Sequence, residues 1–126
     1  STTFWRLSWF RKEVFNMIEL VEEIKSHFDS EYPNEGCGLI IDKGDNDLCW
    51  VPSKNIAEDP VNSFEIEEEV FVKHLLYSNI VAIVHDHVDS DSKASEVDVE
   101  ACKALKIPYW IFSYPKMKLT VIYPEE

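Results

Sequence analysis

The sequence predicts a single α/β domain with a mixed central β-sheet flanked by helices. Stretches with helical spacing of apolar residues alternate along the chain with short apolar stretches rich in β-branched residues. One of these, residues 79–84 (NIVAIV), is a continuous apolar run of the kind that forms a central strand buried on both faces. The length of 126 residues and a composition that is 45% hydrophobic and 13% aromatic suit one folded domain with a real core.

The first 16 residues differ from the rest of the chain. They carry Arg6, Arg11 and Lys12 against Glu13, a charge of +2. The remaining residues carry a charge of −14, which gives the net charge of −12. They lack the apolar core and small-residue cleavage site of a signal peptide. We therefore treat 1–16 as an N-terminal extension of uncertain origin and 17–126 as the domain. We expect the extension to pack on its own domain, with docking on a partner as the alternative.

The elements follow in order from the amino end of the domain. Residues 17–30 place Ile18, Val21, Ile24 and Phe28 at helical spacing and predict an amphipathic helix. Residues 38–42 and 48–53 predict two strands joined as a hairpin by a turn at 44–47. A loop and a short extended segment, 63–66, lead into a second helix over 66–78.

The carboxyl half begins with the buried strand 79–84, which ends in His85 and His87. After a polar loop at 88–94, Ser95 is placed to cap a third helix, with Asp98 at the third helical position, a capping pattern. Two further strands are predicted at 109–113 and 118–123. The order is helix, two strands, helix, strand, helix, two strands.

Charge and cysteine content exclude several classes of function. A net charge of −12 argues against binding to a nucleic-acid backbone, which requires clustered Lys and Arg. No apolar run reaches the roughly 18 residues of a membrane span. The three cysteines, Cys37, Cys49 and Cys102, are scattered and odd in number, so we expect buried, inert thiols in a reducing cytoplasm.

Residues 85–98 (HDHVDSDSKASEVD) contain a possible metal site. Side chains two apart on a strand point to one side, so His85 and His87 can face one point at the carboxyl end of the buried strand. Asp98, in the first turn of the next helix, can return to that point. Two imidazoles and one carboxylate form a three-ligand set suited to one Zn²⁺ per chain, with the fourth position left for water.

Two further residues complete a hydrolytic set. Glu35 lies at a glycine-flanked bend before a buried strand and is a candidate general base. Glu31, four residues earlier, is the alternative. Ser95 is a candidate hydrogen-bond donor to an oxyanion.

Simpler interpretations remain open for each residue. The two histidines are also explained as a hydrogen-bonded pair at a strand end, and Ser95 and Asp98 as helix caps. The acidic loop at 89–91 lacks the glycine and closing glutamate of a calcium loop. A zinc deaminase needs H-x-E and P-C-x-x-C, which this sequence does not contain.

The set of five residues resembles the signature of the JAMM (MPN+) zinc metalloproteases. His85, His87, Ser95 and Asp98 match its H-x-H, seven residues, S, two residues, D spacing, and YPNEGCGLII resembles the segment that supplies the glutamate. VPSKNIAEDPVNSFEI and SEVDVEACKALKIPYWIFSYP are similar to one branch, the amino-terminal domain of phage tail assembly proteins of the lambda K type. The likeness covers about residues 17–123.

The resemblance implies a JAMM/MPN (cytidine-deaminase-like) architecture and a zinc peptidase or isopeptidase acting on a protein or peptide. It makes His85, His87 and Asp98 the zinc ligands, Glu35 the acid/base and Ser95 the oxyanion stabiliser. This chain has H-D-H-V where the family usually has H-S-H-P. We expect the missing proline to loosen the following loop, and Asp86 to alter the surroundings of the ligands or the surface from the opposite side of the strand.

Two hypotheses about function follow. The first is a zinc peptidase in phage tail assembly or tail-protein processing, located in the cytoplasm, which is that of the host if the protein is viral, or in the virion tail. The second is a non-catalytic structural or assembly module of a phage tail tip that keeps the fold. Other phage tail proteins are expected partners in both.

Overall fold

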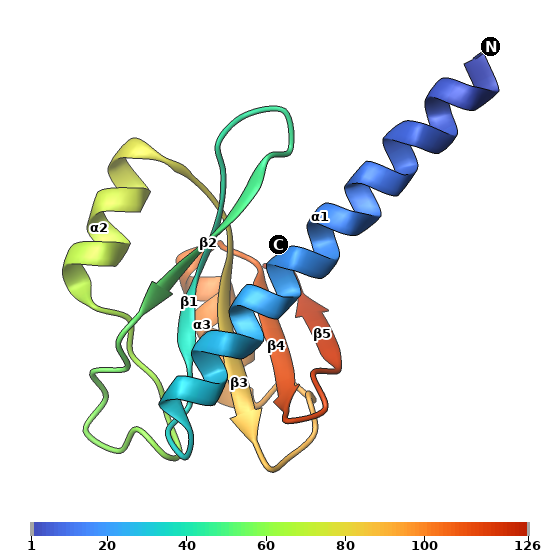
Figure 1. The fold of residues 1–126 in the computed structure, drawn as a ribbon. Helices are drawn as coiled ribbons and strands as arrows, with labels where there is room; N and C mark the ends of the chain where they lie inside the picture. The colour runs from blue at the N-terminus through green and yellow to red at the C-terminus, as the bar shows by residue number, and fades with distance from the viewer. Residues whose placement is uncertain (1, 126) are drawn as a thin grey trace.

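A computed structural model of the chain describes residues 2–125, with the side chains of residues 6–125. It contains three helices and five strands in the predicted order (Figure 1). Their bounds are α1 Thr2–Glu31, β1 Cys37–Asp42, β2 Leu48–Ser53, α2 Glu68–Tyr77, β3 Asn79–Val88, α3 Glu96–Leu105, β4 Tyr109–Tyr114 and β5 Leu119–Ile122. The prediction of one domain with a mixed sheet between helices is confirmed.

The five strands form one sheet in the order β2-β1-β3-β4-β5. Only the β3–β4 pair is parallel, and the other three pairs are antiparallel. The predicted hairpin joins β1 and β2, and its turn uses the left-handed backbone of Gly44 (φ 122°), Asp45 and Asn46. Because β3 lies in the middle, it has a strand on each side along its length, β1 on one side and β4 on the other.

A hydrophobic core lies on each face of the sheet. On one face, Leu20, Ile24 and Phe28 of α1 pack against strand residues that include Val84 and Phe112. On the other face, α2 and α3 cover a second core, in which Cys102 of α3 is buried with strand residues such as Ile83. The molecule is therefore a three-layer α/β/α sandwich, with α1 in front of the sheet and α3 behind it in Figure 1.

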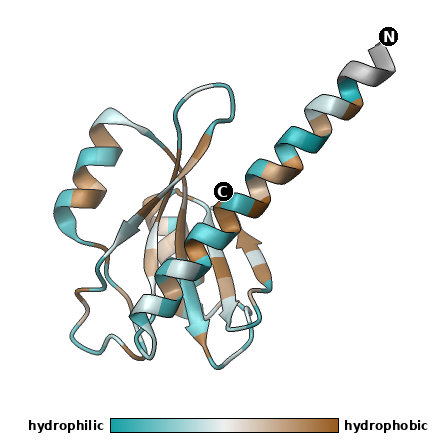
Figure 2. Ribbon diagram, viewed as in Figure 1, coloured by the Kyte–Doolittle hydropathy of each residue, from teal (hydrophilic) through white to brown (hydrophobic). Residues whose placement is uncertain are grey.

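Helix α1 is much longer than the sequence predicts. It continues without a break to Thr2, and its amino-terminal half projects away from the domain (Figures 1 and 2). The prediction that residues 1–16 pack on their own domain is wrong for the side chains described, since Trp9 and Phe10 are 64% and 60% exposed. Leu20 is the first residue of α1 that packs in the core. A straight helix rises about 1.5 Å per residue, so the turns before Leu20 extend beyond the sheet (Figure 1).

The cysteines are free, as predicted. Cys37 and Cys102 are buried and Cys49 is partly buried. Burial raises the pKa of the Cys37 thiol to about 12, so it stays protonated and unreactive near neutral pH. Among residues 2–125, the helices include none with the length and hydropathy that a membrane span requires.

Candidate metal centre

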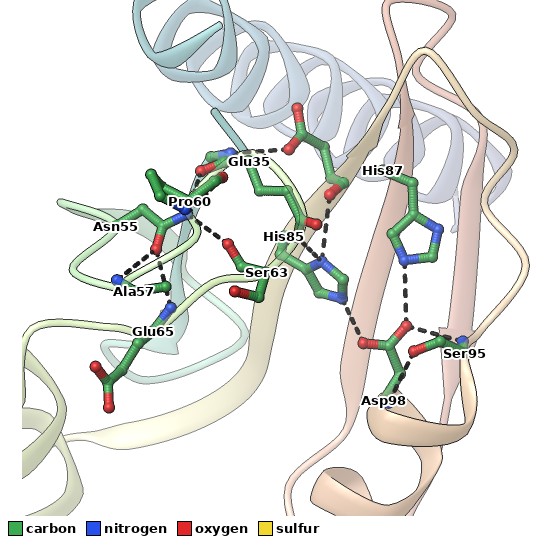
Figure 3. A network of polar contacts seen from close by, with 12 residues as sticks. Glu35, Asn55, Ala57, Pro60, Ser63, Glu65, His85, His87, Ser95 and Asp98 are labelled. Carbon is green, nitrogen blue, oxygen red and sulfur yellow. Dashed lines mark hydrogen bonds and ion pairs between the residues drawn. The ribbon is translucent and has the colours of Figure 1, made fainter. Parts of the chain in front are cut away.

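Two histidines lie side by side at the carboxyl end of β3. His85 and His87 are two residues apart, so both side chains leave the same face of the sheet, toward α3 (Figure 3). Their ring centroids are 5.1 Å apart. His85 is only 2% exposed, whereas His87 is half-buried. Strand β3 runs four residues beyond the predicted 79–84, so both histidines stand on the strand itself.

Helix α3 brings a carboxylate to the two rings. The Oγ of Ser95 accepts a hydrogen bond from the Asp98 backbone N–H (3.0 Å), and Asp98 Oδ2 accepts one from the Ser95 N–H (3.0 Å). This capping box fixes the direction of the Asp98 side chain. Its Oδ1 lies 2.9 Å from His85 Nε2, and its Oδ2 lies 3.2 Å from His87 Nε2. One ligand atom from each residue lies within 4.8 Å of the other two.

The second nitrogen of each ring faces a backbone carbonyl. His87 Nδ1 lies 3.0 Å from the Asp91 carbonyl oxygen, and His85 Nδ1 lies 3.3 Å from the Asp86 carbonyl oxygen. Because a carbonyl can only accept, we assign the ring hydrogens to Nδ1. Each Nε2 faces the ionised Asp98 carboxylate, so it carries a proton while no metal is bound, and loss of that proton exposes the lone pair that a metal needs. Histidines that bind metals are commonly oriented through their second nitrogen in this way.

The Nε2 atom of His85 indicates that the three side chains fit a metal. It is buried, and although Asp98 Oδ1 is 2.9 Å away, the two are not aligned for a hydrogen bond. Buried polar atoms almost always have a partner, so this one is an exception that a bound cation would remove. Two imidazole nitrogens and one carboxylate oxygen form the ligand set of many zinc sites with an open fourth position.

The charges of the cluster favour a bound cation. Burial by itself would lower the pKa of His85, but Asp98 and Glu35 together raise it to about 9. The contact with Asp98 raises the pKa of His87 as well. Burial opposes ionisation of Asp98, yet the two histidines outweigh it and hold the pKa of this carboxyl far below its usual value. Asp98 is therefore ionised, and positive charge stabilises the cluster.

Glu35 contacts the opposite side of the His85 ring. Its Oε1 lies 3.2 Å from His85 Nδ1, and its side chain is almost entirely buried. The following Gly36 allows the chain to pass close to α1, since a Cβ there would lie 2.4 Å from Phe28 Cδ1. Glu31 is the last residue of α1, and in the described structure Glu35 is the one of the two that contacts His85.

The loop after His87 is hydrogen-bonded to the strand beside it, and the loosening expected from the missing proline stays a prediction. Val88 stays in the sheet, paired with Tyr114, and the Asp89 N–H donates to the Tyr114 carbonyl at 2.8 Å. A proline cannot donate such hydrogen bonds, and valine at position 88 lets the strand continue. Asp91 turns its carbonyl toward His87, and Ser92 contacts Thr120 at 2.7 Å.

Two residues beside the site, Phe64 and Asn55, are not predicted from the sequence. The ring of Phe64 stacks on His85, with centroids 4.2 Å apart and planes at 19°. The side chain of Asn55 binds the backbone of the segment that contains Phe64 and of Glu35. Asparagine is common in turns because its side chain can accept from the backbone N–H two residues further on, and this is the only local signal for Asn55. No local pattern identifies Phe64, because its partner is 21 residues away.

A largely apolar groove opens beside the metal centre. Its volume is about 470 Å³, and Asp98 forms part of its wall. The other residues along it include Phe64, Ile66, Phe71, Val97, Leu105 and Tyr109. The carboxylate therefore lies where a polar backbone group of a bound chain could meet the metal ligands while an apolar side chain occupies the groove.

Comparisons with known proteins support a common family. Residues 17–122 match the protein family described as prokaryotic homologs of the JAB domain. The tail tip assembly protein K of Escherichia phage N15 is 32% identical over 104 residues, which are 82% of this chain and 42% of that protein. The chain thus spans less than half the length of this relative.

Two solved structures share the fold. A solution structure of a protein from Desulfitobacterium hafniense has a TM-score of 0.64 at 20% identity, covering 82% of this chain and 77% of that one. A solution structure of a protein from Salinibacter ruber has a TM-score of 0.55 at 21% identity. The match covers 82% of this chain and 76% of that one.

Proposed function

Since the chain belongs to the family of prokaryotic homologs of the JAB domain, we propose that it is a zinc-dependent peptidase or isopeptidase that hydrolyses an amide bond. The observation that carries this proposal is the convergence of His85, His87 and Asp98, in which the buried Nε2 of His85 lies 2.9 Å from the carboxylate. The residues fit zinc in number, chemical type and orientation by backbone carbonyls.

Each residue has a separate role in this proposal. His85 and His87 through Nε2, and Asp98 through its carboxylate, hold the metal. Zinc, when bound, acts as a Lewis acid and lowers the pKa of a water molecule toward 7. Glu35, the nearest carboxylate outside this set, accepts a proton from the attacking water and passes it to the nitrogen of the leaving amine.

Ser95 is assigned to the developing oxyanion. Its Oγ already accepts the Asp98 N–H, so its own hydroxyl hydrogen is free to be donated. The apolar groove beside Asp98 would take a side chain of the protein or peptide substrate. Its residues exclude water from one side of the site, which strengthens the electrostatic interactions there.

We also propose that the activity serves phage tail assembly or the processing of a tail protein, with other tail proteins as partners, in the host cytoplasm or in the virion tail. This part of the proposal is supported by the likeness to a tail tip assembly protein. The same likeness supports the second candidate, a non-catalytic assembly module of the tail tip that keeps the fold.

The substitution Glu35→Gln separates these candidates. It keeps the size of the side chain and the three metal ligands but removes the proton acceptor. We expect zinc to stay bound while hydrolysis of a peptide library falls by about 100-fold or more, in the range of general acid–base catalysis. Glu58→Gln, at an exposed carboxylate that does not line the groove, is the matched control and should retain activity.

Two results would overturn the proposal in different ways. If Glu35→Gln hydrolyses peptides as fast as the parent, Glu35 is not the base. If the zinc-loaded parent cleaves no peptide but binds a tail protein equally well with and without the substitution, the assembly module is the correct function.

A further inference from the structure

In the loop between β2 and α2, residues 54–67, the side chain of Asn55 bonds to four backbone groups of the loop and to the backbone of Glu35. Asn55 Oδ1 accepts hydrogen bonds from the Ala57 N–H (3.0 Å) and the Glu65 N–H (3.1 Å). Its Nδ2 donates to the carbonyls of Ser63 (2.9 Å), Pro60 (3.2 Å) and Glu35 (3.0 Å). Both hydrogens and both lone pairs of the amide are therefore in use (Figure 3).

The first contact between this loop and the candidate metal centre is with the backbone of Glu35. The Glu35 carbonyl accepts from Asn55, and its N–H donates to the Pro60 carbonyl at 2.7 Å. Glu35 lies between α1 and β1, so neither a helix nor a strand fixes its backbone. On its far side, the Gly36 N–H donates to the buried Asp86 Oδ1 at 2.8 Å. The position of Glu35 thus depends on side chains from two other segments.

The second meeting point is His85. Phe64 lies between Ser63 and Glu65, which both bind the Asn55 side chain through their backbone, and its ring stacks on the His85 imidazole. One amide therefore restrains two neighbours of His85 that do not belong to the predicted ligand set. They are the carboxylate at Nδ1 and the aromatic ring over its face.

We propose that Asn55 is a positioning residue that sets where the Glu35 carboxylate and the Phe64 ring lie relative to His85. The proposal rests on the proposed function for its effect on turnover, but its effect on His85 is independent of turnover. Asparagine suits the role because one half of its side chain accepts and the other half donates. Aspartate keeps the shape and the acceptor half but places a carboxylate oxygen against three carbonyls.

The test compares Asn55→Asp with Asn62→Asp. Asn62 lies in the same exposed loop and donates only to Asp59, at 3.1 Å, so its substitution reproduces the charge change away from Glu35. The readout is the ¹H–¹⁵N spectrum of the histidine rings in metal-free protein at one pH. We expect Asn55→Asp to shift the His85 ring signals in the same direction as Glu35→Gln does. The signals of His27 and His74 should stay in place.

Turnover is measured on the zinc-loaded protein. If the proposed function holds, Asn55→Asp lowers kcat by about 10–100-fold with zinc content and KM nearly unchanged, as for residues that orient a metal site. If the zinc-loaded parent protein cleaves no peptide, the proposed function is refuted. The His85 ring signals then test the positioning role of Asn55 by themselves.

Unchanged His85 signals together with a lowered melting temperature would overturn the inference and reduce Asn55 to a loop-closing role. If Asn55→Asp does not fold, Asn55→Gln, which keeps the amide but displaces it by one methylene, is interpreted in the same way. In the unmodified protein, hydrogen exchange gives an independent test. The N–H groups of Glu35, Ala57 and Glu65 should open together, and three unrelated exchange rates would contradict the inference.

Discussion

Asp86, between the two histidines, links the metal centre to the opposite face of the sheet. Its side chain points away from His85 and His87 and is 1% exposed. One oxygen accepts the Gly36 N–H, and the other has no hydrogen-bond partner among the described residues. Burial raises the pKa of this carboxyl to about 7. Asp86 therefore acts by tying β3 to the residue after Glu35, and it does not alter the molecular surface.

A second carboxylate, that of Asp29, makes the stability of the folded protein depend on pH in the acid range. Tyr114 donates a hydrogen bond to it at 2.6 Å and Lys25 donates one at 3.1 Å. Both hydrogen bonds lower the pKa of Asp29, and the one from Tyr114 has the larger effect. Because the folded pKa is lower than the unfolded one, Asp29 contributes stability above the unfolded value of about 3.8. That stability is lost as the pH falls through the folded pKa.

The substitution Tyr114→Phe should raise the Asp29 pKa toward its usual value. An NMR titration of the carboxyl carbon measures this directly. Tyr77→Phe, at an 84% exposed tyrosine on α2, is the control and should leave the midpoint unchanged. An Asp29 midpoint that is the same in Tyr114→Phe and in the parent would show that the hydrogen bond does not form in solution.

At the scale of elements, α1 consists of an anchored half and a projecting half. Leu20, Ile24 and Phe28 anchor it to the sheet, whereas the side chains of residues 6–19 are almost all exposed. Removing residues 1–16 should therefore change the free energy of unfolding by no more than about 1 kcal/mol, the scale of helix-propensity and surface effects.

Chemical denaturation of the chain that starts at Met17 tests this prediction. A chain that starts at Lys25 loses Leu20 and Ile24 and should be destabilised by several kcal/mol, at about 2–5 kcal/mol for each large core side chain removed. Equal stability of the two shortened chains, or a large loss in the first, would contradict the division of α1.

The elements also show what sequence can predict. Period-two alternation on β3 and the capping box on α3 are local patterns, so they predicted that His85, His87 and Asp98 lie together. The length of α1 was not predicted because the apolar residues at helical spacing begin only after residue 16, and the different charge of residues 1–16 suggested a separate segment. The positions of Asn55 and Phe64 depend on a loop closed by contacts with Glu35 and His85, and no local pattern encodes such contacts.

At the scale of the whole molecule, the sheet order places the site. Strand β3 is central, with β1 antiparallel on one side and β4 parallel on the other, and the β3–α3–β4 crossover brings the start of α3 to the carboxyl end of β3. Ligands in open α/β sheets commonly bind at that end. Glu35 precedes β1, which pairs with β3, so the same arrangement brings the proposed base to His85.

The central claim is that this cluster binds zinc, and metal analysis tests it most directly. The protein, purified without chelators and then supplied with zinc, should contain about one zinc per chain, as expected for a site with three protein ligands. His85→Ala/His87→Ala should contain none. His74→Ala, at a half-buried histidine on α2 that contacts Ser78, should keep the metal. A folded protein without zinc after this treatment, or zinc retained by the double variant, would contradict the account.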